Sequence, residues 1–209
     1  MENIRGFRIK GNRGLSHWAP LLEEWMLATE RFCRVSKGAD APYAYTERAH
    51  VGLLAAAAWH CGWIALEEFQ HEKGVKYRPK WGGRGDLYLV SNGRSELVEA
   101  KFRWLSFRAN KFQELATQML AEAVDDARHA NGAKDFSGVG VAFLSFYAPP
   151  SSKKPIIEHI NPCVEKLLAV KSDAVAWCFP RETRGMENDS GEILPGTAML
   201  IRDAELPEA

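Results

Sequence analysis

The sequence lacks the marks of several protein classes. No apolar run approaches the roughly 18–20 residues of a membrane-spanning helix, and the longest, Val51 to Trp59, is mostly alanine. Residues 1–10 carry charges but no apolar segment, so they do not read as a signal peptide. Basic and acidic residues number 27 each. The resulting net charge of zero excludes a histone-like or acidic-tail protein but allows a local basic groove.

Metal and cofactor motifs are also scarce. The cysteines stand far apart, without the CxxC or Cys/His spacing of zinc sites, at positions 33, 61, 163 and 178. We expect free, mostly buried thiols in a reducing compartment, which predicts a cytoplasmic protein. The sequence has no HExxH, P-loop, GxSxG or GxGxxG motif, so it carries no sign of the enzyme classes that these motifs mark.

What remains is an ordinary globular composition. The 209 residues are 46% hydrophobic, 26% charged and 11% aromatic, as is typical of a folded protein. We expect one domain over residues 1–209, with a core at about 46–147. An N-terminal helical extension at 1–42 and a C-terminal helix and strands at 155–203 complete this prediction.

Hydrophobic periodicity predicts the order of elements. Helical spacing occurs at 16–33, 47–60, 110–130 and 162–170. Strand patterns occur at 63–69, 86–90, 97–102, 139–147, 174–179 and 197–202, with a basic loop at 71–85 and a mobile loop at 181–195. This order predicts an α/β fold in which a mixed central sheet is flanked by helices on both faces.

The strands at 86–90 and 97–102 are predicted to form a hairpin. Asn92-Gly93 between them is the strongest short hairpin signal, because both turn positions need a positive φ. With these two residues in the turn, Asp86 lies directly opposite Glu99, with Cβ atoms about 4.5–5.5 Å apart. Like charges so placed destabilise a sheet and call for a cation. Carboxylate oxygens with open positions beside them suit Mg²⁺ or Mn²⁺.

Lys101 extends this polar face of the hairpin. It lies two residues beyond Glu99, so period-two alternation puts both side chains on the same face. A lysine beside a metal-bound carboxylate can orient water and stabilise charge on a phosphoryl oxygen. The opposite face is apolar and is expected in the core, with Leu87, Leu89, Val98 and Ala100.

These residues resemble a known family. Gly85-Asp86, twelve intervening residues and Glu99-Ala100-Lys101 are similar to the signature of the PD-(D/E)xK nuclease superfamily, with Gly85 in place of the proline. The core of that superfamily is α-β-β-β-α-β, the restriction-endonuclease-like fold. The element order predicted over residues 46–147, about half of the chain, matches this core.

The resemblance implies a metal-dependent nuclease, and we take DNA as the expected substrate. Asp86, Glu99 and the backbone carbonyl of Ala100 would hold Mg²⁺ or Mn²⁺, and Lys101 would position the attacking water. Glu47, on the first core helix, matches an acidic residue that many members carry and that would serve a second metal or a metal-bound water. Many such nucleases also dimerise to cut both strands, so a homodimer is compatible with this interpretation.

Two further residues have a structural alternative. Glu47 stands at a helix start, where an acid also complements the helix dipole. Gln118 matches the glutamine of a QxxxY pattern found in some branches, but Glu122 stands in place of the tyrosine. A surface position on the helix at 110–130 explains Gln118 equally well.

Basic residues adjoin the hairpin on both sides and are interleaved with Tyr77 and Trp81. Such a pattern suits phosphate contacts and base stacking, although a solvated loop has the same composition. The predicted nucleic-acid contacts are Lys76, Arg78, Lys80, Arg84, Arg103, Arg108 and Lys111. The alternatives to an active nuclease are an inactive module of the same fold that binds nucleic acid or a protein, and an unrelated domain with a chance ExK.

Overall fold

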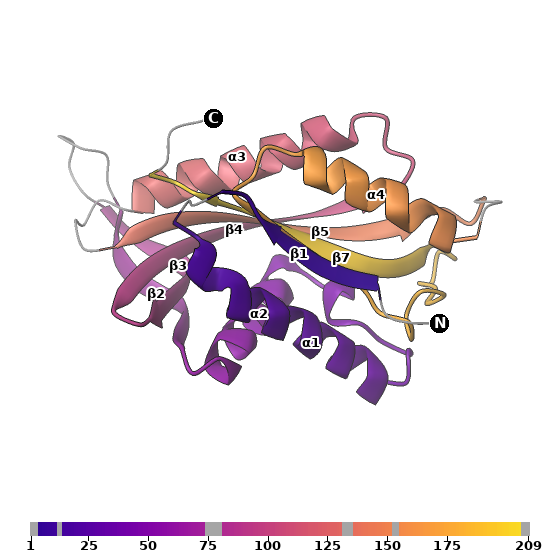
Figure 1. Cartoon of the computed structure of the whole chain (residues 1–209), viewed down its shortest axis with the longest axis horizontal. Coiled ribbons are helices and arrows are strands. Elements are labelled where there is room, and N and C mark those ends of the chain that lie inside the picture. Colours follow the sequence, from indigo (N-terminus) through magenta and orange to yellow (C-terminus); the bar gives the residue numbers. More distant parts are fainter. Residues whose placement is uncertain (1–3, 12–13, 74–80, 131–135, 152–154, 206–209) are drawn as a thin grey trace.

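The protein is an α/β protein built on one mixed sheet. The computed structural model describes residues 4–11, 14–73, 81–130, 136–151 and 155–205 (Figure 1). Within these residues the strands are β1 (Ile4–Ile9), β2 (Ile64–Lys73), β3 (Trp81–Ser91), β4 (Arg94–Ser106), β5 (Ser137–Ala148), β6 (Ala174–Phe179) and β7 (Ile193–Asp203). The helices are α1 (Ala19–Val35), α2 (Glu47–His60), α3 (Phe112–Ala130) and α4 (Ile157–Ala169), with short 3₁₀ turns at Ser16–Trp18 and Pro42–Ala44.

The sheet is open, with two edge strands. Its seven described strands lie in the order β1-β6-β7-β5-β4-β3-β2. β4 and β5 run parallel, and every other neighbouring pair is antiparallel. The sheet is therefore mixed, as the sequence predicts.

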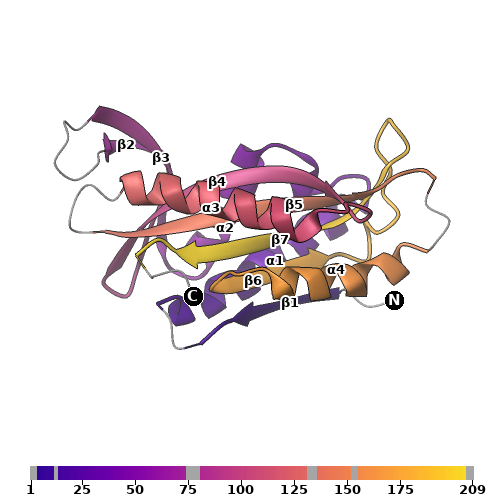
Figure 2. The same cartoon turned by 90° about the horizontal axis from the view of Figure 1, so that it is seen from above.

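Two pairs of helices cover the two faces of the sheet. α1 and α2 share one core with the sheet, and α3 and α4 share another on the opposite face (Figure 1). α3 lies along β4 and β5, while α4 packs against β6 (Figure 2). The prediction of helices on both faces is confirmed.

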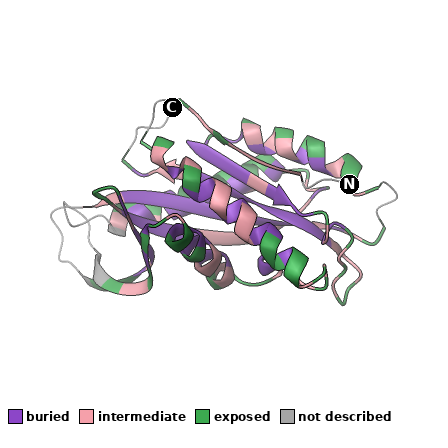
Figure 3. Cartoon of the chain, turned by 60° about the horizontal axis from the view of Figure 1, so that its bottom comes forward, coloured by how far each residue is buried: buried purple, intermediate pink, exposed green. Residues whose placement is uncertain are grey.

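The central strand β5 explains why both faces are apolar. Val141 and Phe143 pack in the core with α1 and α2, whereas Ala142 and Leu144 pack in the core with α3 and α4. Alternate side chains thus point to opposite faces, and each face is covered by helices. Figure 3 shows the central strands buried beneath helices whose outer sides are exposed.

Gly140 sets how closely α3 approaches the sheet. A Cβ atom on Gly140 would lie 2.5 Å from the backbone nitrogen of Val124 in α3, closer than real Cβ atoms come. Glycine at this position therefore brings the second half of α3 onto the sheet where β4 carries the ExK residues.

Some predicted boundaries are wrong. β1 was predicted as part of a helical extension, but it pairs antiparallel with β6 at the edge of the sheet. Residues 71–73 and 81–85 were predicted as loop, but they extend β2 and β3, which pair with each other along this stretch. α4 begins at Ile157 and contains Pro162, which was predicted to start the helix.

The segment between β6 and β7 is tied to the fold, although the sequence predicts a mobile loop there. The buried guanidinium of Arg184 donates hydrogen bonds to the carbonyl of Phe179, at 3.3 Å from Nε and 3.1 Å from Nη2. A bridge between Glu187 and Ile193 then leads into β7, which begins four residues before the predicted strand.

The four cysteines are free; three are buried and Cys61 is half-buried. Burial raises the pKa of the Cys33 thiol to about 11, so it is protonated at neutral pH. Among the helices of the described residues, none combines the length and the hydropathy of a membrane span.

Candidate functional site

The β3–β4 hairpin has the predicted turn. Asn92 and Gly93 have φ values of 45° and 79°, as a two-residue hairpin turn requires. Tyr88 pairs with Leu97 and Ser91 pairs with Arg94, which is the predicted register. Leu87, Leu89, Val98 and Ala100 are buried in the core with α1 and α2.

The ladder between these strands ends one pair earlier than predicted. The last pair is Leu87 with Val98, so Asp86 and Glu99 are not paired across the hairpin. From this point β3 stays with β2, while β4 stays with β5 as far as Ser106. The direct opposition of the two acids was wrong because the strands part to follow different neighbours.

Two carboxylates occupy the place where the strands part. Asp86 accepts a hydrogen bond of 2.7 Å from the backbone N–H of Ala100. The backbone N–H of Phe102 acts to lower the pKa of Glu47, which lies in the first turn of α2. Asp86 thus replaces the ladder partner that Ala100 loses. Since the N–H and C=O of one strand residue point to the same side, the carbonyl of Ala100 faces this opening as well.

The charged groups around the opening influence one another. Burial raises the pKa of Glu47 and the charge of Asp86 adds to this, with Lys101 and the Phe102 N–H acting against them. Burial acts to lower the pKa of Lys101, but the ion pair with Asp126 and the charges of Glu47 and Asp86 outweigh it, so its pKa is raised. Lys101 is therefore a charged ammonium that interacts electrostatically with the two carboxylates.

Asp126 is a site residue that the sequence analysis missed. One of its carboxylate oxygens lies 2.5 Å from the Lys101 ammonium, and both side chains are partly exposed. Asp126 comes from α3, between the buried Ala123 and Ala127, so it stands at the border of the helix's apolar face. That border position is the one signal in the sequence that could have drawn attention to it.

Glu99 lies on the α3 face of β4, as alternation from Lys101 requires. Its side chain is buried, and it is paired in the parallel ladder with Gly140. The acids that line the adjoining pocket are Glu47, Glu67, Glu68 and Asp86, and Glu99 is not among them. The structure thus brings Glu47, Asp86 and Lys101 together and places Glu99 beside Lys101.

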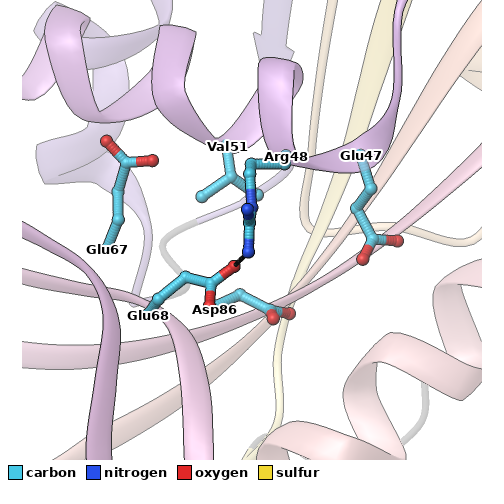
Figure 4. Close-up of a pocket in the computed structure, with 6 residues that line it drawn as sticks. All are labelled: Glu47, Arg48, Val51, Glu67, Glu68 and Asp86. Atoms are coloured by element: carbon cyan, nitrogen blue, oxygen red, sulfur yellow. Dashed lines mark hydrogen bonds and ion pairs between the residues drawn. The ribbon is translucent and has the colours of Figure 1, made fainter.

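A small pocket opens next to Asp86 (Figure 4). It has a cavity volume of about 50 Å³ and is lined by Glu47, Arg48, Val51, Glu67, Glu68 and Asp86. A water needs roughly 10–15 Å³ of such space, so the pocket has room for an ion with a few waters.

The donor set suits a hard cation that keeps part of its water. Asp86, Glu47 and the Ala100 carbonyl offer oxygen atoms only, as Mg²⁺ prefers, and Mg²⁺ is often bound through one or two carboxylates. In the part of the chain that the structure describes, no group of three or more His, Cys, Asp or Glu side chains could hold a metal ion. The residues therefore fit a Mg²⁺ with few protein ligands and do not form a complete cage.

Gln118 is not brought to this site. It is exposed on α3 and donates a hydrogen bond of 3.0 Å to Glu122. Gln118 and Asp126 are separated by eight positions, which correspond to about 12 Å along a helix. The surface alternative for Gln118 agrees with this position.

The predicted nucleic-acid contacts are spread around the site. Arg84 forms an ion pair with Glu68 at 2.5 Å, and Arg103 is half-buried on the Lys101 face of β4. Arg108 donates to the Ser151 hydroxyl and carbonyl, at 3.2 and 3.1 Å. Lys111 pairs with Glu114 at 3.2 Å in an exposed position. Lys76, Arg78 and Lys80 lie outside the described residues.

Comparison with family models, with curated proteins and with solved structures found no match to this chain. Its function is therefore argued from the residues and geometry above.

Proposed function

We propose that the protein is a Mg²⁺- or Mn²⁺-dependent nuclease that hydrolyses phosphodiester bonds of DNA. The observation that carries the proposal is the parting of β3 and β4, which gathers the Asp86 carboxylate, the Ala100 backbone and Glu47 beside the Lys101 ammonium. An oxygen-lined opening next to a fixed positive charge is what metal-assisted phosphoryl transfer needs.

The order of elements supports a restriction-endonuclease-like core. From Glu47 to Ala148 the chain forms α2, β2, β3, β4, α3 and β5, which is the α-β-β-β-α-β order of that fold. In this core the aspartate lies on the second strand and the ExK lies on the third, as Asp86 and Glu99 to Lys101 do here. β1, α1 and the elements after β5 are additions to it.

Each residue has a defined role in the proposed reaction. Asp86 and the Ala100 carbonyl would hold the metal, and Glu47 would bind a second metal or a metal-bound water. Glu99, which is buried on the α3 face of β4 and does not line the pocket, is proposed as a further metal ligand. When bound, the metal activates water and neutralises charge on the phosphoryl oxygens. Lys101 holds the attacking water and stabilises the charge that develops on the phosphorus oxygens.

A second candidate is an inactive module of the same fold that binds nucleic acid or a protein partner. Two observations favour it: Lys101 already pairs with Asp126, and the described acids do not form a three-carboxylate cluster. A homodimer and a cytoplasmic location stay predictions for both candidates.

A cleavage assay decides between the two candidates. The full chain is incubated with supercoiled plasmid, linear duplex, single-stranded DNA and RNA, each with Mg²⁺, with Mn²⁺ and with EDTA. The nuclease proposal expects metal-dependent cleavage of at least one DNA that is lost in Asp86→Asn and retained in Asp125→Asn. Asp125 is an exposed acid on α3 that forms an ion pair with His129 and does not line the pocket, so it provides the same change in charge. Binding of DNA without cleavage would favour the inactive module.

A further inference from the structure

Two arginines from different elements converge on one carboxylate in the pocket. Glu68, on β2, receives Arg48 from α2 on one oxygen and Arg84 from β3 on the other, the latter at 2.5 Å. Figure 4 shows Arg48 reaching across to Glu68 beside Asp86. These two contacts hold the pKa of Glu68 below its ordinary value.

The backbone at Glu68 is distorted. Its φ is +50°, a left-handed value that non-glycine residues seldom adopt within a strand. Glu67 pairs with Leu87 and Phe69 pairs with Gly85, but the ladder skips the position between them, where Glu68 and Asp86 face each other. Strain of this kind persists where the surrounding structure imposes it and occurs often at functional sites.

Stability does not account for this arrangement. The arginine side chains are 73% and 61% exposed, and ion pairs between exposed groups contribute little to the free energy of unfolding. A guanidinium binds phosphate with the same planar geometry that it uses for carboxylate. A carboxylate held between two arginines therefore occupies a site that would accept a phosphate group.

We infer that Arg48 and Arg84 form a two-arginine clamp for one phosphate group of the bound DNA strand, with Glu68 as an internal anion that this phosphate displaces. The inference rests on the proposed function, because Arg48 and Glu68 line the same pocket as Glu47 and Asp86. A phosphate in the clamp would hold the strand next to the Asp86 opening. Glu68 would keep the clamp formed and closed to small anions when DNA is absent.

The decisive variant removes the internal anion. Binding of a fluorescein-labelled 20-bp duplex is measured by fluorescence anisotropy in EDTA, so that no cleavage takes place. Glu68→Gln should tighten binding by roughly three- to tenfold, because DNA no longer competes with a tethered carboxylate. Glu68→Gly, which suits the positive φ and also lacks the carboxylate, should tighten binding as well.

Glu67→Gln is the matched control. Glu67 lines the same pocket, and its substitution removes the same charge without touching either arginine pair. If Glu67→Gln tightens binding as much as Glu68→Gln, the effect comes from the loss of one negative charge in the pocket, and the proposed clamp is wrong. Unchanged or weaker binding in Glu68→Gln and Glu68→Gly would overturn it too, as would a lack of DNA binding by every variant.

The arginines themselves give the second readout. Arg48→Gln and Arg84→Gln should each weaken DNA binding and lower the slope of log K against log salt by about 0.9. The tightening caused by Glu68→Gln should disappear when Arg48→Gln and Arg84→Gln are both present. Tightening that persists in this background would contradict the clamp.

Cleavage with Mg²⁺ is measured in parallel on the same proteins. If no protein cleaves DNA but the binding results are as expected, the clamp stands and the nuclease proposal fails. If the wild type cleaves DNA but Glu68→Gln binds like Glu67→Gln, the nuclease proposal stands and the clamp fails.

Discussion

The carboxylate of Asp86 accepts a hydrogen bond of 2.7 Å from the backbone N–H of Ala100 where the β3–β4 ladder ends. The bond spans the gap between the parting strands and satisfies an N–H that the ladder leaves without a strand partner. Asp86 thus has a structural contact in addition to its proposed metal-binding role, and substitutions can separate the two.

Asp86→Asn and Asp86→Ala should differ in stability and agree in activity. The asparagine retains an oxygen that accepts the Ala100 hydrogen bond, whereas alanine leaves this N–H without an acceptor, at a cost of about 1–3 kcal/mol in the free energy of unfolding. Both should abolish cleavage. Urea unfolding and single-turnover cleavage measure the two effects. Cleavage by Asp86→Asn at the wild-type rate would exclude Asp86 as a metal ligand.

Divalent metal should stabilise the fold. A ligand that binds only the folded state at ten times its dissociation constant adds about 1.4 kcal/mol. For a chain of this size that raises the melting temperature by roughly 3–6 °C. Thermal scans with EDTA, Mg²⁺ and Mn²⁺ measure the shift, and Asp86→Asn should reduce it. If the melting temperature is the same in millimolar metal and in EDTA, the proposed metal site is wrong.

Lys101→Ala should lower turnover while leaving DNA affinity nearly intact, because the ammonium is proposed to act on the transition state. Binding and single-turnover cleavage are compared in one buffer at two salt concentrations. Lys171→Ala is the control, since Lys171 is an exposed lysine between α4 and β6 and is not among the predicted nucleic-acid contacts. A loss of affinity in Lys101→Ala equal to its loss of turnover would make Lys101 a phosphate contact and favour the binding module.

His50 predicts a loss of stability in mild acid. It is buried against Phe102 and Phe143, with its Nε2 at 3.2 Å from the Ser145 hydroxyl. Burial lowers its pKa to about 4, below the value of about 6.5 for an unfolded chain. The unfolded state therefore binds the proton more readily. Stability from the neutral ring is complete above pH 6.5 and is lost as the pH falls toward about 4.

Urea unfolding at pH 7.5, 6, 5 and 4.5 tests this dependence. The contribution of His50 approaches about 1.4 kcal/mol per pH unit between the two pKa values. His50→Gln should remove the contribution of one proton from the slope of the free energy of unfolding against pH, whatever its effect on stability at pH 7.5. An unaltered slope in His50→Gln would mean that other groups cause the acid sensitivity.

The sequence determines these features to different extents. The turn and the register of the β3–β4 hairpin could be predicted to the residue because Asn92-Gly93 is a local turn signal between two alternating apolar strands. β1 could not be placed, because its partner β6 lies far along the chain and no turn joins them. The ends of β2 and β3 carry charged residues and glycines with low strand propensity, and their pairing with each other overrides that propensity.

The residues of the site also differ in how far the sequence predicts their positions. Asp86 and Lys101 lie just beyond the end of the β3–β4 ladder on strands joined by a short turn, so the turn signal predicts that they belong to one region of the sheet. Asp126 reaches Lys101 only because α3 packs closely on β5 at Gly140, a tertiary contact without a local signal. The contacts of Glu68 depend on a distortion of β2 that no pattern in the sequence predicts.

The pairing of β1 with β6 also has a consequence for biosynthesis. The paired residues are far apart in the chain, with Ile9 opposite Ala174 and Ile4 opposite Phe179. β1 therefore leaves the ribosome long before β6 and cannot dock on the sheet until β6 has followed. Until then the backbone N–H and C=O groups of β1 have no strand partner, and a strand of another nascent chain can pair with them. This sheet is thus completed late in translation. Pairing between strands of different chains is favoured on crowded polysomes, where neighbouring nascent chains lie close together.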